Sequence, residues 1–490
     1  MRDAHGGFFA ELHTCARSIA GGRTLACIYH AGEYRLFGAH RTGYQFASIA
    51  FLAFDAALFY AIVRQARLAR PWAFLAGAAL VLFPASDSAR LWDVASLGQY
   101  VMALVLAAIL VALSALRRRG PVAIVLHLLS AALAVLAMAT YEIALPLVAL
   151  GGAAYYFCYR DRRALGRWSL DIGLVLLFLI YRVAVAPVSS ASGFLVHRNA
   201  SQTVDRVKTL LGGAWSTWRS VYVPGHLGTV ALVALAVVTA ALFRFSTGGF
   251  ATSARRWLIQ AAVGVALSAA GALVYLTAND LYVPEVYSTF NRLNVPGSFG
   301  YVAVAVAVLG LTYEVLRAVR LPRPAAACVV LLMVAASAVH QLSISSEHIR
   351  SWETSWDDQQ QALAGYRVAL RGAPRTAEII GFDTPIWELG FVPVFAAGWD
   401  LRGAIDYETS VNPPVAYPML PTLVCGSPGV VEGGALIAAY NQPGAPLYFA
   451  SPTRRIIVRV ATKEICERLI REWGRPPFWG STVTGVRFRT

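Results

Sequence analysis

The sequence predicts an all-α helical bundle that crosses a membrane many times, followed by a small C-terminal α/β domain. Hydrophobic residues make up 57% of the 490 residues, charged residues make up only 14%, and the mean hydropathy is +0.55. Soluble globular chains of this length rarely combine these values. Apolar runs of membrane-spanning length, separated by short loops, lead to the same fold class.

Ten apolar segments are long enough, or nearly so, to cross a hydrocarbon core of about 30 Å as a helix. The second and the fifth segments are short, so each could form a tilted, kinked or partly re-entrant helix. The segments are 44–63, 72–86, 96–116, 121–138, 143–159, 168–188, 226–245, 254–277, 299–318 and 324–344.

Arginines gather in alternate loops between these segments. Short cytoplasmic loops collect Lys and Arg, so these loops are expected on the cytoplasmic side. The sixteen residues are Arg64, Arg67, Arg70, Arg117, Arg118, Arg119, Arg160, Arg162, Arg163, Arg167, Arg244, Arg255, Arg256, Arg317, Arg320 and Arg323. The predicted organisation is therefore a first extracytoplasmic loop (1–43), a transmembrane domain (44–344) and an extracytoplasmic α/β domain (345–490).

Residues 1–43 carry five arginines and are placed outside the cytoplasm with no span before them. The opening "MRDAHGGFFAELHTC" lacks the charged stretch and apolar core of a signal peptide. We expect the true start to lie upstream, with an eleventh helix that delivers this segment across the membrane. Direct translocation of a short N-terminal segment is the alternative.

The net charge of +15 belongs to residues 1–344, which comprise the first loop and the transmembrane domain. Residues 1–344 contain 28 basic and 13 acidic side chains, whereas residues 345–490 contain 14 of each. This distribution excludes a nucleic-acid partner and favours attraction to anionic lipid. Forty arginines against two lysines indicate a GC-rich bacterial genome.

Beyond residue 344 the sequence alternates helix and strand patterns. Helices are predicted for "SWDDQQQALAGYRVAL" and "KEICERLIREW", and strands for "AEIIGF", "PLYFA" and "RRIIVRVA". Pro and Gly are dense between 412 and 445, which predicts a loop. In the earlier segment 189–225, "TVDRVKTLLGGAWSTWRSVYVP" predicts an amphipathic interfacial helix.

Cysteines fall in both predicted extracytoplasmic parts. Cys15 and Cys27 lie in the first loop, and Cys425 and Cys466 lie in the C-terminal domain. In an oxidising compartment they allow two disulfides, with the pairing left open.

Two charges, Asp55 and Arg182, fall inside apolar segments. A charge in hydrocarbon is rare unless it is paired or faces a cavity, so we expect these two side chains to meet. For Asp55, a structural or cavity-lining role is favoured over catalysis.

Five stretches resemble, in order, motifs of the GT-C class of membrane glycosyltransferases, which includes protein O-mannosyltransferases and bacterial relatives. The family often has a lysine where this chain has Tyr141 and an acid where it has Asn291, and "ASDS" lacks a histidine. The stretches are "GGRTLACIYHAGEYRLFGAHRTGYQFAS", "LFPASDSARLW", "ATYEIALPLV", "FLIYRVAVAP" and "TFNRLNVPGSFGYV".

The resemblance implies transfer of a sugar from a polyprenyl-phosphate donor to a glycan, lipid or protein acceptor outside the cytoplasm. Such a reaction needs a carboxylate to take the proton of the acceptor hydroxyl and cations near the departing phosphate. In the family the base is an Asp in the first outer loop, and Asp3 is the match. Glu11 and Glu33 are second candidates, although a solvated loop acid is the favoured reading for both.

Further site residues are expected in short extracytoplasmic loops. Arg292 is assigned to the donor phosphate, because guanidinium suits bidentate contact with phosphate, and an ion pair with Glu285 or Asp280 is the alternative. Glu142 is expected to take part in catalysis, with orientation of the acceptor, metal binding and an arginine ion pair as its open roles. Asp87, Arg90 and Trp92 are assigned to the acceptor or its sugar.

The sequence leaves the use of a divalent metal open. It predicts a multi-pass protein of the bacterial inner membrane. Two other function classes remain: a transporter or flippase of envelope glycan or lipid precursors, and a non-enzymatic envelope assembly protein.

Overall fold

The computed structural model describes residues 24–474, with gaps at 39, 92, 185–197, 224, 246–248, 279, 281, 288, 389–391, 396–397, 421 and 433. The chain forms two compact units, a helical unit within residues 8–346 and an α/β unit within residues 347–490.

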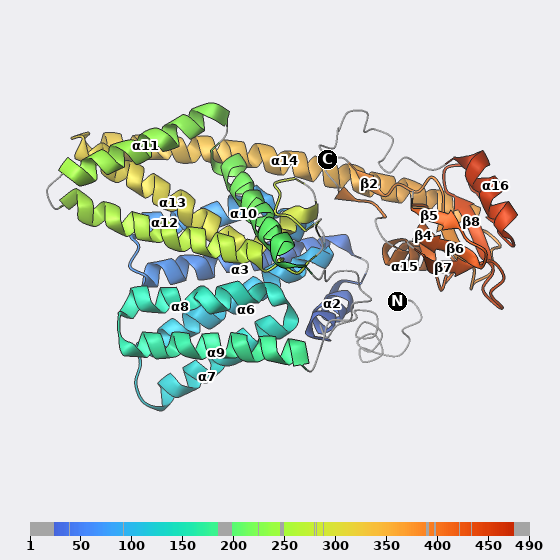
Figure 1. The fold of residues 1–490 in the computed structure, drawn as a ribbon, viewed down its shortest axis with the longest axis horizontal. Helices are drawn as coiled ribbons and strands as arrows, with labels where there is room; N and C mark the ends of the chain where they lie inside the picture. The colour runs from blue at the N-terminus through green and yellow to red at the C-terminus, as the bar shows by residue number, and fades with distance from the viewer. Residues whose placement is uncertain are drawn as a thin grey trace. The chain divides into compact units, whose positions relative to one another are not determined.

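Long helices build the helical unit (Figure 1). They are α3 (Arg41–Gln65), α4 (Arg70–Leu82), α6 (Asp93–Leu116), α7 (Pro121–Thr140), α8 (Leu145–Tyr159), α9 (Arg162–Ala184), α10 (Ala200–Tyr222), α11 (Gly225–Phe245), α12 (Gly249–Leu273), α13 (Val295–Ala318) and α14 (Arg323–Ala369), which continues into the α/β unit.

Helices coincide with all ten predicted apolar segments. Eight of the described helices are long and apolar enough to cross a membrane, and shorter apolar helices occupy 70–82 and 228–242. At about 1.5 Å per residue, the 13 residues of α4 extend about 20 Å, less than a hydrocarbon core of about 30 Å. The described residues therefore have the features of a multi-pass membrane protein, with fewer full-length spans than the ten predicted.

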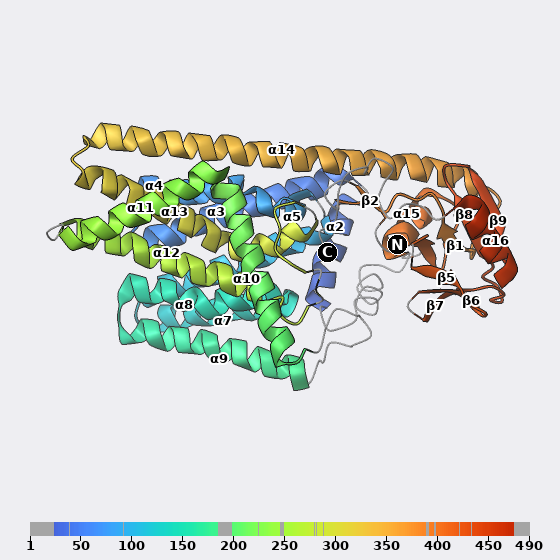
Figure 2. The same cartoon turned by 45° about the horizontal axis from the view of Figure 1, so that its top comes forward.

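Successive helices from α3 to α9 run antiparallel, so their connections fall at two opposite ends of the helical unit (Figure 2). One end carries the short 3-10 helices η1 (Pro84–Ser86), η2 (Glu142–Ala144) and η4 (Thr289–Asn294), which follow α4, follow α7 and precede α13, together with α2 (Thr24–Phe37). We call it the η end. The opposite end carries the arginine-rich connections, and we call it the arginine end.

Helices α12 and α13 approach each other closely through glycines. A Cβ atom added to Gly271 would lie 2.6 Å from the backbone nitrogen of Gly297, and one added to Gly300 would overlap the carbonyl oxygen of Gly264. Small residues spaced three or four apart let helix backbones approach in membranes. This contact fixes where α13 begins at the η end.

Helix α10 is the amphipathic helix predicted within 189–225. Asn199 and Gln202 form a capping box at its start, which satisfies backbone N–H groups that the helix leaves unpaired. Lys208 on its exposed side pairs with Asp205 at 3.2 Å.

The α/β unit is built on a four-stranded sheet with the order β4-β1-β8-β9. Strands β4, β1 and β8 are parallel, and β9 is antiparallel to β8. A three-stranded antiparallel sheet, β5-β6-β7, and the β2-β3 pair complete the strands. The bounds are β1 (Glu378–Gly381), β2 (Trp387–Glu388), β3 (Val392–Pro393), α15 (Gly398–Glu408), β4 (Ala416–Pro418), β5 (Leu423–Cys425), β6 (Gly429–Glu432), β7 (Ala435–Ala439), β8 (Leu447–Ser451), β9 (Ile456–Arg459) and α16 (Lys463–Trp473).

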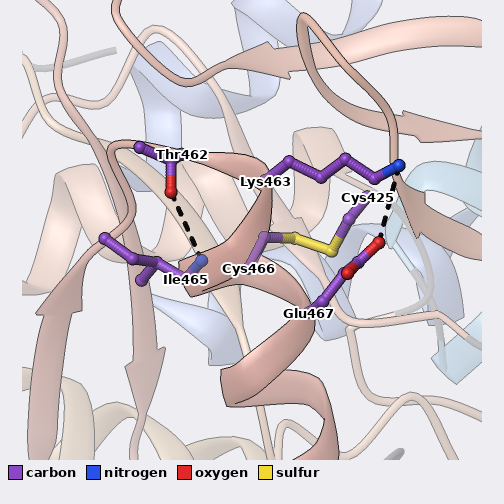
Figure 3. Close-up of a disulfide and its surroundings, with 6 residues drawn as sticks. All are labelled: Cys425, Thr462, Lys463, Ile465, Cys466 and Glu467. Carbon is purple, nitrogen blue, oxygen red and sulfur yellow. Dashed lines mark hydrogen bonds and ion pairs between the residues drawn. A yellow bond between two sulfur atoms is a disulfide. The ribbon is translucent and has the colours of Figure 1, made fainter.

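A disulfide joins Cys425 at the end of β5 to Cys466 in the first turn of α16 (Figure 3). Their Cα atoms lie 6.1 Å apart, and the bond closes a separation of 41 residues. Thr462 caps α16 by accepting from the backbone N–H of Ile465, and Lys463 pairs with Glu467 in the same turn. The structure thus fixes one pairing that the sequence left open. Cys27 is also disulfide-bonded.

The helix predicted for 355–370 is confirmed for 355–369, where it forms the last part of the unbroken helix α14. The prediction of a loop over 412–445 is wrong, since β4 to β7 lie within it. Its glycines serve turns between short strands: Gly434 and Gly444 have φ of +86° and +76°, which favours glycine.

Replacing Gly300 by alanine is expected to lower the free energy of unfolding by about 1–3 kcal/mol, because the added methyl group collides with the backbone of α12. Gly173→Ala in α9 is the matched control, since nothing lies within 4 Å of a Cβ atom there. Alanine also favours a helix over glycine, so the control should be neutral or stabilised by up to about 1 kcal/mol. Unfolding in mixed detergent micelles measures both. Equal stabilities for the two variants would contradict the close α12–α13 contact.

Candidate functional site

Two asparagines hold the interrupted segments of the η end together. The side-chain oxygen of Asn291 accepts from the backbone N–H of Ser88 at 2.9 Å. The Asn294 amide donates to the carbonyl oxygens of Ala85 (2.8 Å) and Glu285 (2.7 Å). Both asparagines are almost fully buried. We call Asn291 and Asn294 the asparagine clasp, and it joins η1 and α5 (Ser88–Leu91) to η4.

Asp87 and Arg90, predicted to bind the acceptor, form a buried ion pair of 2.8 Å. Ser345 donates to the second carboxylate oxygen of Asp87 at 2.9 Å, and Arg90 also donates to the carbonyl of Phe83 at 2.8 Å. Burial lowers the pKa of Arg90, and the charge of Asp87 opposes this effect. These contacts bind the two side chains to the protein itself, and their role in sugar binding stays a prediction. Trp92 lies outside the described residues.

Glu142 in η2 pairs with Arg182 near the end of α9, with 2.8 Å between Oε1 and Nη2. Of the three roles left open for Glu142, the structure shows the arginine ion pair. The expectation that Asp55 and Arg182 meet is therefore wrong. Asp55 instead lines a small cavity between α3, α6 and α13. The sequence could not show whether Asp55 or Glu142 pairs with Arg182. Glu142 is 40 residues from Arg182 in the chain and lies in a turn, so no local pattern links the two.

Arg292 lies in η4 between the two residues of the clasp and is half-buried. Its guanidinium carbon is 5.4 Å from the ring centroid of Phe290 and 5.8 Å from that of Tyr282. The two rings meet edge to face at 5.7 Å. A guanidinium over aromatic faces is attracted by the ring quadrupoles, which helps to orient it.

Two arginines, one in α10 and one just before it, anchor the loop that carries Tyr282. Arg206 donates to the carbonyl of Tyr282 at 2.7 Å, and Arg198 pairs with Asp280 at 2.6 Å. This pairing commits Asp280 to a residue other than Arg292.

Glu33 is not a solvated loop acid, as the sequence had suggested. It lies in α2, is only 5% exposed, and has the Nδ1 atom of His30 at 3.4 Å. Neither of its carboxylate oxygens has a hydrogen-bond partner among the described residues. The pattern Ala26, His30, Glu33 at helical spacing was the available signal, but the polar letters around it suggested a loop.

One turn before Glu33, Tyr29 fixes α2 to the bundle. Its hydroxyl group is 2.9 Å from that of Ser96, and its ring stacks on Tyr100 at 4.9 Å. The same face of α2 therefore holds a buried carboxylate and contacts the start of α6. Asp3 and Glu11, the other carboxylate candidates, lie outside the described residues.

Within the described part of the chain, no group of three or more His, Cys, Asp and Glu side chains is placed to hold a metal ion. Comparison of the chain with protein-family models, with curated proteins and with solved structures gives no match.

The Glu142–Arg182 pair is expected to show energetic coupling of about 1–2 kcal/mol in a double-mutant cycle, because both side chains are partly shielded from solvent. Glu142→Ala and Arg182→Ala should each destabilise the protein, and the double variant should be little worse than either. Thermal unfolding of the four proteins in one detergent gives the coupling. Strictly additive losses would show that the ion pair contributes nothing to stability.

Proposed function

We propose that the protein is a bacterial inner-membrane glycosyltransferase of GT-C type, which moves a sugar from a polyprenyl-phosphate donor to an acceptor outside the cytoplasm. One observation carries the proposal. The five stretches that resemble the family are scattered over almost 300 residues of the sequence, yet their described parts gather at the η end around η1, η2, η4, α2 and the end of α9.

The proposed orientation places the arginine end in the cytoplasm and the η end on the opposite side. Residues 347–490 then lie outside the cytoplasm, because α14 starts at the arginine end and crosses once. The Cys425–Cys466 disulfide supports an oxidising compartment for the α/β unit. Cys158 and Cys328, which lie near helix ends at the arginine end, are free thiols.

The proposed reaction is a single inverting displacement. The acceptor hydroxyl oxygen bonds to the anomeric carbon while the bond from that carbon to the phosphate oxygen breaks. The bonding electrons leave with the polyprenyl phosphate, and the hydroxyl proton passes to a carboxylate. Arg292 would neutralise the departing phosphate. Glu33 and Asp3 are the candidates for the base, and a divalent metal remains open as an aid to the phosphate.

Burial of Glu33 supports its assignment as a base. Neither of its carboxylate oxygens has a hydrogen-bond partner among the described residues, so both keep lone pairs that could accept the proton of an acceptor hydroxyl group. The Nδ1 atom of His30, 3.4 Å from Glu33 Oε2, would orient the carboxylate. The stacked Tyr29 and Tyr100 rings present an aromatic surface of the kind that sugar rings contact.

A second candidate, transport of a lipid-linked envelope precursor, is favoured by one feature. Helix α4 ends at Leu82 and gives way to η1 beside the buried Asp55. Interrupted helices with polar side chains at the break are typical of secondary transporters. Release of polyprenyl phosphate separates the two functions, because transport leaves the donor intact.

Arg292→Ala is expected to lower kcat/KM for the donor by about 10²–10³-fold, the usual effect of removing a group that stabilises developing charge. Arg292→Lys should retain part of the activity, since it keeps the charge but loses the planar donor pair. The assay uses the full chain in proteoliposomes, a panel of polyprenyl-phosphate sugars and membrane extract as acceptor, with release of polyprenyl phosphate as readout.

Lys208→Ala is the matched control for this assay, because Lys208 is an exposed cation on α10. Its activity should equal that of the unchanged protein. Full activity of Arg292→Ala would remove Arg292 from the donor site. Absence of prenyl-phosphate release with every donor would overturn glycosyl transfer itself.

Glu33→Gln is expected to lower turnover by about 10²–10⁴-fold, because it removes the proton acceptor but keeps the shape of the side chain. Donor affinity, measured by binding of the prenyl-phosphate sugar, should change less than about twofold in a residue that acts only on the acceptor. If turnover is unchanged, Glu33 is not the base, and Asp3→Asn becomes the decisive variant.

A further inference from the structure

A small cavity lies inside the helical unit, next to the asparagine clasp. Its volume is about 20 Å³. Its polar lining comes from four elements: Asp55 of α3, Ser86 of η1, Gln99 of α6 and Ser298 of α13. Apolar side chains of α3, α4, α6 and α13 form the rest of the wall. A space of this size holds one guest about as large as a water molecule.

The cavity has unpaired oxygens on its wall. Asp55 and Gln99 are each only 3% exposed, and neither Asp55 Oδ1 nor Gln99 Oε1 has a hydrogen-bond partner among the described residues. A buried polar atom without a partner costs free energy, and a buried carboxylate costs more. Something else must therefore compensate these two oxygens.

The two serines add further acceptors. Ser298 donates its hydroxyl hydrogen to the carbonyl oxygen of Val295 at 2.7 Å, and Ser86 donates to that of Phe83 at 3.4 Å. Each hydroxyl oxygen then has only lone pairs left for the cavity. No Lys, Arg or His is among the residues that line it. The wall thus offers oxygen acceptors, one of them the carboxyl group of Asp55, together with the side-chain amide of Gln99.

The backbone beside the cavity is also unusual for a membrane bundle. Between Leu82 and Ser88 the chain leaves the α-helical conformation, and Ser86 reaches the cavity from this break. Irregular backbone at membrane depth is tolerated where it lines a cavity, and ion sites in membrane proteins use such breaks.

We propose that this cavity binds one sodium ion. Its single carboxylate balances one positive charge, and its neutral oxygens replace water around a hard cation. Potassium takes longer contacts to its oxygen ligands than sodium does, and magnesium gives up its water shell reluctantly. The proposal rests on the cavity alone and holds whether the protein transfers sugar or transports a substrate.

Sodium-dependent stability of the purified full chain in detergent tests the proposal. The melting temperature is measured from 0 to 300 mM NaCl, with N-methyl-D-glucamine chloride added to keep ionic strength constant. A specific ligand stabilises by mass action, so a saturable rise of about 3–6 °C is expected at a hundredfold excess over Kd. Potassium should give less than half of this rise, and binding of ²²Na⁺ to the same protein should saturate at one ion per chain.

Asp55→Asn should abolish both the rise in melting temperature and ²²Na⁺ binding. Ser298→Ala removes only one neutral oxygen and should raise the apparent Kd for sodium several-fold. Asp205→Asn, an exposed carboxylate on α10, is the control and should respond like the unchanged protein. Equal melting temperatures in sodium and N-methyl-D-glucamine, or a sodium response that survives in Asp55→Asn, would overturn the proposal. A response to pH with none to sodium would also overturn it, because the guest would then be a water beside a protonated Asp55.

Discussion

Backbone N–H and C=O groups cannot stay unpaired in a bilayer, and the η end meets this constraint with side chains. Asn291 and Asn294 reach from η4 to backbone groups of the segment 84–91 and of the loop before η4. Arg90 does the same for the carbonyl oxygen of Phe83, where α4 has just ended. These bonds let the chain leave the helix on the inside of the bundle, so two polar sites can form there.

Both sites depend on the same few contacts. Arg292 has its backbone between the two asparagines, so its guanidinium is held against Tyr282 and Phe290. Ser86 and Ser298 lie just outside the clasp on either side and face the cavity that contains Asp55. A change in the clasp would therefore affect the proposed phosphate contact and the proposed ion site together. The close α12–α13 packing helps to hold both sites in place, because it fixes the first turns of α13, which carry Ser298.

The sequence was sufficient for features that depend on composition over many residues. Apolar runs and arginine-rich loops placed helices at all ten predicted segments, and the alternating pattern of "RRIIVRVA" predicted β9. It failed where a partner lies far along the chain. The pairing of Glu142 with Arg182, and the cavity of Asp55, depend on which helices become neighbours. The strands within 416–439 were missed because they are only three to five residues long and are separated by glycine turns.

The scarcity of lysine has a practical consequence for this chain. Lys208 on α10 and Lys463 on α16 are its two lysines, one in each compact unit, and both side chains are well exposed. Amine-reactive dyes would thus mark each unit at a single side chain without introduced cysteines. Energy transfer between the two dyes would then report how far apart the units lie in a lipid bilayer, and whether that distance changes when a donor lipid or sodium is added.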